Sequence, residues 1–171
     1  GASFILACGS AQEKTETQDP SQTGHLEPPQ PGEDRYYVRH AFPVSTTAES
    51  QCTILRNKGY VSCYSELRKA PLWVAFRLFT TDGTSYEPRQ PPGEFLDDPR
   101  VNAQAPHDGS EGVGYVPVPL APFAAIERLY GHDAGRETYL KSNVVLQKAG
   151  LSREYWLREQ GQELVNWAEE H

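Results

Sequence analysis

The chain contains no methionine, only three cysteines and no long apolar run. A helix that crosses a membrane needs about 20 apolar residues, so the sequence predicts no transmembrane helix. Basic residues are in the minority, with 16 Lys and Arg against 23 Asp and Glu and a net charge of −7. This balance lacks the positive footprint of nucleic-acid-binding surfaces, although a local basic groove is still allowed. Because the initiator methionine is missing, we expect the given sequence to be a fragment or a processed product of a longer chain.

Composition divides the chain into three parts. Residues 1–8 are apolar, residues 9–35 are polar and acidic, and residues 36–171 carry most of the aromatic residues. The second part is rich in Gln, Glu, Thr, Pro and Gly. It cannot bury enough apolar surface to offset the entropy of ordering, which predicts a disordered tether. The third part has room for one domain, which we expect to begin near Tyr36.

The N-terminal residues 1–7, GASFILA, are typical of the end of a secretory signal sequence. Cys8 follows, between small residues, and resembles the lipobox cysteine of bacterial lipoproteins, which becomes the lipidated first residue. The resemblance implies an extracytoplasmic protein that is anchored to a membrane through Cys8, or a secreted one. The alternative is a short apolar N-terminus with a chance cysteine.

The sequence predicts a β-hairpin from the strand-like runs CTIL (52–55) and YVSCY (60–64). A two-residue loop at Asn57 and Lys58 places Cys52 opposite Cys63. A three-residue loop with Gly59 in a left-handed conformation shifts the register by one residue and loses that pairing. An extracytoplasmic location permits a disulfide between the two cysteines, and two half-buried thiols are the alternative.

The remaining elements predict a mixture of strands and helices. Residues 71–79, PLWVAFRLF, predict a central strand that is covered on both faces. Residues 84–113 are rich in turn formers and predict a long loop. A short helix is expected over residues 121–130, then a strand over residues 138–146. A final helix is expected to begin at Ser152, a good N-cap residue.

The order of several short motifs resembles the DNA/RNA non-specific endonucleases, a family with a ββα-metal finger. The motifs are GYVSCY (59–64), APLWVA (70–75), FLDDPRV (95–101), GYVPVPLAP (114–122) and ETYLKSN (137–143). The resemblance implies an α+β fold with an antiparallel central sheet and a finger of strand, short helix, strand and C-terminal helix. It also implies a domain that is incomplete at its C-terminus, since the family continues into a further strand.

The resemblance further implies a nuclease site that binds nucleic acid. A His serves as general base, an Arg holds the phosphate and an Asn binds one Mg²⁺. The family's DRGH motif reads VPVP here, with Pro119 at the base position and Pro117 at the Arg position. Ser152 and Glu159 are the candidate metal ligands, and Asn143 matches the family's pattern. Proline can neither transfer a proton nor carry a charge, so we expect a catalytically impaired enzyme or a pseudonuclease.

Two alternatives stay open. The first is an active, Mg²⁺-dependent nuclease with a displaced base, His107 or His132, near Asn143. Asp108, Glu159 or Asp133 would then lie near the metal. An uncharged imidazole at neutral pH can accept a proton from water, which makes a His the natural substitute. The second is a small α+β envelope lipoprotein that acts as a binding module and is unrelated to the family.

Overall fold

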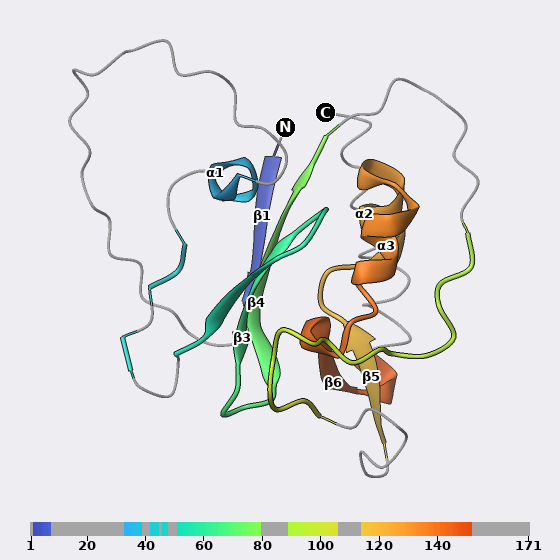
Figure 1. Ribbon diagram of the computed structural model, residues 1–171. Coiled ribbons are helices and arrows are strands. Elements are labelled where there is room, and N and C mark those ends of the chain that lie inside the picture. The colour runs from blue at the N-terminus through green and yellow to red at the C-terminus, as the bar shows by residue number, and fades with distance from the viewer. Residues whose placement is uncertain are drawn as a thin grey trace, which may run out of the picture.

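The computed structural model describes residues 2–7, 33–38, 42–44, 46–47, 51–79, 89–105 and 114–151. Its strands are β1 (Ala2–Ala7), β2 (Thr53–Arg56), β3 (Val61–Ser65), β4 (Ala70–Leu78), β5 (Tyr115–Pro119) and β6 (Val144–Lys148). Its helices are α1 (Asp34–Tyr37), α2 (Phe123–Tyr130), α3 (His132–Glu137), the 3-10 turn η2 (Lys141–Asn143) and α4 (Ala149–Leu151). A four-stranded antiparallel sheet has the order β1-β4-β3-β2, and β5 and β6 form a second sheet (Figure 1). The predicted α+β fold with an antiparallel central sheet is confirmed.

Strand β4 is covered on both faces, as its nearly continuous apolar sequence predicts. Successive side chains of a strand point to opposite faces. Val74 and Phe76 therefore pack in a core cluster with Ile126 of α2. Trp73, on the other face, packs in a cluster with Tyr37 of α1. Helices α1 and α2 accordingly lie on opposite sides of the sheet (Figure 1).

The β2–β3 hairpin forms as predicted, but its loop differs from both registers considered. Arg56 pairs with Val61, and the backbone N–H of Asn57 donates to the carbonyl of Tyr60 at 2.9 Å. The two-residue loop therefore begins one residue later than expected, at Lys58. A left-handed Gly59 is also wrong, since the glycines with positive φ in the described residues are elsewhere.

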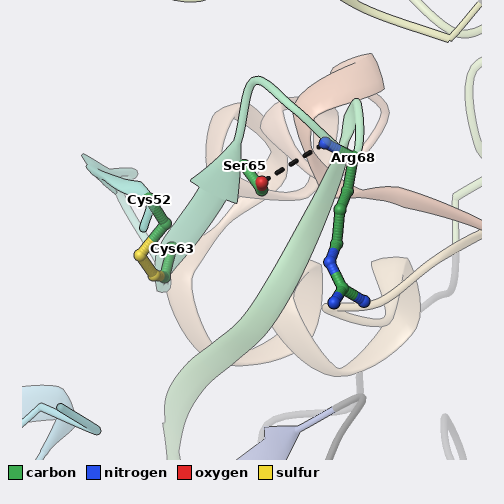
Figure 2. The surroundings of a disulfide bond; sticks show 4 residues. All are labelled: Cys52, Cys63, Ser65 and Arg68. Atoms are coloured by element: carbon green, nitrogen blue, oxygen red, sulfur yellow. Dashed lines mark hydrogen bonds between the residues drawn. A yellow bond between two sulfur atoms is a disulfide. The ribbon is translucent and has the colours of Figure 1, made fainter. Parts of the chain in front are cut away.

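A disulfide joins Cys52 and Cys63 even though the two residues are not directly opposite (Figure 2). Cys63 pairs with Ile54 in the hairpin, so Cys52 is its diagonal neighbour. The two Cα atoms are 5.3 Å apart, within the range that a disulfide spans. The bond ties the residue before β2 to the buried strand β3.

Gly59 allows α2 to pack against the hairpin loop. A Cβ atom at this position would lie 2.7 Å from Cγ2 of Ile126 and 3.0 Å from the ring of Tyr130. We expect Gly59→Ala to lower the free energy of unfolding by about 1–3 kcal/mol, because overpacking forces the helix to move. Chemical denaturation measures the change, and Gly93→Ala is the matched control because nothing lies within 4 Å of its Cβ position. Equal stability of the two variants would show that α2 adapts freely.

The predicted strand over residues 138–146 is wrong in its first half, because β6 begins only at Val144. The preceding residues form a turn, a single parallel bridge between Leu140 and Leu96, and η2. Tertiary contacts hold this backbone away from a ladder with β5. Leu96 donates to the carbonyl of Tyr139 at 3.0 Å and accepts from the N–H of Lys141 at 2.8 Å.

Two segments that precede the expected domain start have secondary structure. Ala2–Ala7, expected to be the end of a signal sequence, form β1 and pair with β4. Helix α1 begins at Asp34, before the expected domain start at Tyr36, and Asp34 accepts two hydrogen bonds from Arg56 at 2.7 and 2.6 Å. Cys8 and most of the tether lie outside the described residues. No described helix has the length and apolar character of a membrane span.

Candidate functional site

Strands β5 and β6 provide the two strands of the expected finger. They run antiparallel, with Tyr115 opposite Lys148 and Pro119 opposite Val144. Helices α2 and α3 and the turn η2 lie between them in the sequence, and α4 follows β6 directly. The predicted helix from Ser152 onward lies outside the described residues.

The two prolines of β5 are compatible with a strand because of where they lie in the ladder. The N–H of Leu120 donates to the carbonyl of Asn143 at 2.8 Å, which makes these two residues a bonded pair. Bonded and non-bonded pairs alternate in an antiparallel ladder, so Pro117 and Pro119 occupy non-bonded positions. The N–H groups that they lack would point away from β6. No other described strand pairs with that edge of β5.

One face of the finger is almost entirely apolar. Six residues share this face, which we call the outer face, and five of them are apolar: Tyr115, Pro117, Pro119, Val144 and Leu146. Its inner end is buried at Pro119 and Val144, and its far end is open, with Tyr115 47% and Leu146 42% exposed. Lys148, opposite Tyr115, is the charged residue at that far end. The position at which the family places its base therefore lies in an apolar, buried environment.

Asn143 is fully buried, and its side chain is bonded to the backbone on both sides. Its Oδ1 atom accepts from the N–H of Ala121 at 2.9 Å. Its Nδ2 atom donates to the carbonyl of Thr138 at 2.8 Å and to that of Ala121 at 3.2 Å. The amide thus connects the residues after β5 with those after α3. Asn143 acts here as a clamp that holds the finger against the helices.

His132 lies at the other end of α2 from the finger and faces a buried carboxylate. Its Nδ1 atom is 2.9 Å from Oε1 of Glu127, and the two side chains are 38% and 2% exposed. Oε2 of Glu127 also accepts the backbone N–H of Arg89 at 3.4 Å. Helix α2 has 8 residues, or about 12 Å of length, and separates His132 from Asn143 at its N-terminal end. The structure does not bring these two candidate residues together.

The other candidates from the sequence are accounted for as follows. Asp133 is turned toward the hairpin loop, where its carboxylate is 3.3 Å from Nζ of Lys58 and its side chain is 78% exposed. It is therefore a surface ion pair at the same end of α2 as His132. The candidates outside the described residues are His107, Asp108, Ser152 and Glu159.

The described part of the finger does not supply ligands for Mg²⁺, which prefers oxygen donors in octahedral geometry. No group of three or more His, Cys, Asp or Glu side chains able to hold a metal occurs in the described ranges. Among the described residues, the buried Oε1 atom of Gln147 has no hydrogen-bond partner. However, Gln147 pairs with Val116 and so lies on the face opposite to the outer face. The outer face, as far as it is described, does not fit the metal.

A buried polar network that the sequence pattern did not indicate holds the loop after residue 89 against the hairpin. Asp98 is 0% exposed and accepts hydrogen bonds from Oγ of Ser142 at 2.5 Å and from Nε and Nη2 of Arg100 at 2.8 and 2.6 Å. Arg100 also donates to the carbonyl of Arg56 and to Oδ1 of Asn57. Burial alone raises the pKa of Asp98, but the bonds from Arg100 and Ser142 outweigh it and hold the pKa below its usual value.

An antiparallel strand pair with inserted helices and a helix directly after it defines an α+β protein compatible with the ββα-finger class. Residues 39–159 match the family profile for DNA/RNA non-specific endonucleases. This match covers most of the 171 residues, and the chain belongs to that family. The family predicted from the motif order is thus confirmed, and with it a nuclease-like domain. A search of curated proteins found no significant match.

Proposed function

We propose that the chain is a nuclease-family domain that does not hydrolyse phosphodiester bonds and acts as a binding module. The outer face of the finger carries this proposal, because Pro119 and Pro117 replace the family's base and Arg among apolar neighbours. A general base contributes about 10²–10⁴ to the rate, and the lost Arg and metal ligand remove further stabilisation of the phosphate. Activity near background is the consequence.

Nucleic acid is the partner that the family implies. The net charge of −7 opposes tight binding to a polyanion, so binding through a local groove should be weak and should fall steeply with salt. The mechanism available to this chain is therefore recognition without a hydrolytic step.

Plasmid cleavage by the purified chain, with Cys8→Ser to keep it free of lipid, tests the proposal. We expect no nicking with Mg²⁺ or Mn²⁺ above an EDTA control, while near-UV circular dichroism shows that the protein is folded. Metal-dependent nicking by the folded protein would overturn the proposal.

A second candidate is an active nuclease with a displaced base, and the contact between Glu127 and His132 favours it. A buried carboxylate that orients an imidazole is a common arrangement for a general base. If nicking occurs, the variants His132→Ala and His107→Ala identify the base. The variant that lacks the base should lose nicking activity while it stays folded, and the other variant should keep its activity. Glu127→Gln should then lower activity together with His132→Ala.

We also propose that the protein works outside the cytoplasm and is anchored through Cys8. The lipobox-like residues support this, as does the Cys52–Cys63 disulfide, because disulfides persist in oxidising compartments. We expect Cys8→Ser to move the protein from the membrane fraction to the soluble fraction. The double variant Cys52→Ser/Cys63→Ser is the control and should stay with the membrane. A Cys8→Ser protein that remains in the membrane fraction excludes this anchor.

A further inference from the structure

Strand β1 pairs with the edge of β4 that faces away from β3, which we call the outer edge of β4, along most of the length of β4. The pairing runs without a break from Ala2 opposite Leu78 to Ala7 opposite Trp73. Strand β3, the other neighbour of β4, pairs with it only as far as Ala75. The last three residues of β4 therefore have β1 as their one paired strand within the described residues.

This end of β4 lies at the centre of the packing. Phe76 and Leu78 are each 1% exposed and belong to the core cluster below α2. Between them, Arg77 places its guanidinium carbon 5.0 Å from the ring centre of Tyr36, and its carbonyl accepts a hydrogen bond from the hydroxyl of Tyr130 at 2.7 Å. Both faces of the sheet thus depend on the position of this backbone, although β1 is the one strand among the described residues that pairs with it.

We propose that the outer edge of β4 is a binding site for an extended apolar peptide and that Ala2–Ala7 is its ligand. An open edge presents unpaired N–H and C=O groups and accepts a strand through backbone hydrogen bonds in a fixed register. GASFILA carries neither charge nor proline, so nothing in it opposes a strand. The proposal rests on the proposed function at one point: cleavage before Cys8 makes the ligand a separate peptide, which then binds the same edge in trans.

A cross-link in the intact chain tests the register. Ser3 lies opposite Arg77, so Ser3→Cys with Arg77→Cys, in a Cys8→Ser background, should form a disulfide under mild oxidation. Ala7→Cys with Arg77→Cys is the matched control and should not, since Ala7 lies opposite Trp73. Equal yields from the two pairs would show that residues 2–7 do not hold this register, and would overturn the proposal.

Peptide exchange tests binding in trans. The full chain, with Cys8→Ser and a specific protease site in the tether, is folded first and then cut, and a labelled GASFILA peptide is added. We expect saturable binding that is about tenfold tighter than that of the same peptide with Ile5→Pro and Leu6→Pro, because proline removes backbone donors. Hydrogen exchange at those backbone N–H groups of residues 76–78 that face β1 should slow when the wild-type peptide binds.

The peptide experiment has a clear negative result. If wild-type and proline peptides bind equally, or if release of residues 1–7 leaves amide exchange at the end of β4 unchanged, the edge is not a strand-binding site. Neither readout depends on hydrolysis or on lipid attachment. Failure here is therefore distinguishable from failure of the proposed function.

Discussion

Replacing Asn143 by alanine should lower the free energy of unfolding by about 3 kcal/mol or more. The substitution removes the bonding partner of three backbone groups, one N–H and one carbonyl of Ala121 and the carbonyl of Thr138. Each buried polar group left without a partner costs about 1–3 kcal/mol, and these groups lie away from bulk water because Asn143 is 0% exposed. Urea denaturation followed by tryptophan fluorescence measures the loss.

The matched control for Asn143→Ala is Asn102→Ala. Asn102 is exposed, and its side chain makes a single long contact of 3.4 Å to Glu66. Its substitution should change stability by less than about 0.5 kcal/mol, as is usual for surface positions. If Asn143→Ala were as mild as Asn102→Ala, the clamp would contribute nothing, and the family's Asn would have to be retained for another reason.

The elements that the sequence predicts well are those whose signals are local. The nearly continuous apolar sequence of residues 71–79 identifies β4, and Gly131, with φ of 90°, follows the last residue of α2, at the end of the helix expected over residues 121–130. The motif order also identifies the family, because each motif is short and keeps its place in the chain. The local sequence pattern is sufficient to predict an element whose conformation depends mainly on its own residues.

The predictions of secondary structure fail where contacts with residues distant in the sequence determine the local conformation. The hairpin loop differs from the predicted one, and its Gly59 packs closely against Ile126 of α2, a contact that the turn residues alone cannot reveal. Strand β6 starts late because Leu96 binds the backbone before it. In each case the missing information is a tertiary contact.

The candidate site also combines a feature that the sequence shows with one that only the structure shows. The substitution of VPVP for the family's motif is visible in the sequence, but its physical consequence needs the register. The bonded pair of Leu120 and Asn143 shows that Pro117 and Pro119 occupy the non-hydrogen-bonded positions of the ladder with β6. A strand can therefore keep its path with proline at both of these positions, which is why the fold survives at this site.

The buried carboxylate of Asp98 should give the chain an acid-sensitive component of stability. We expect Asp98→Asn to lower the free energy of unfolding at pH 7 by about 3 kcal/mol, because Arg100 and Ser142 lose their charged acceptor. The adjacent Asp97→Asn is the matched control. Asp97 is 75% exposed and pairs with Lys141 at 2.6 Å, and such surface pairs contribute about 0–1 kcal/mol.

The pH dependence distinguishes this charged network from simple packing. The pKa of Asp98 is lower in the folded protein than its usual value of about 3.9, so the stabilisation is complete above that pH and is lost as pH falls through the folded pKa. The difference between wild type and Asp98→Asn should therefore narrow on acidification below about pH 4. Denaturation curves between neutral and acid pH measure it. A difference that stays constant in acid would mean that the substitution acts through shape, because only a carboxylate can lose its contribution by binding a proton.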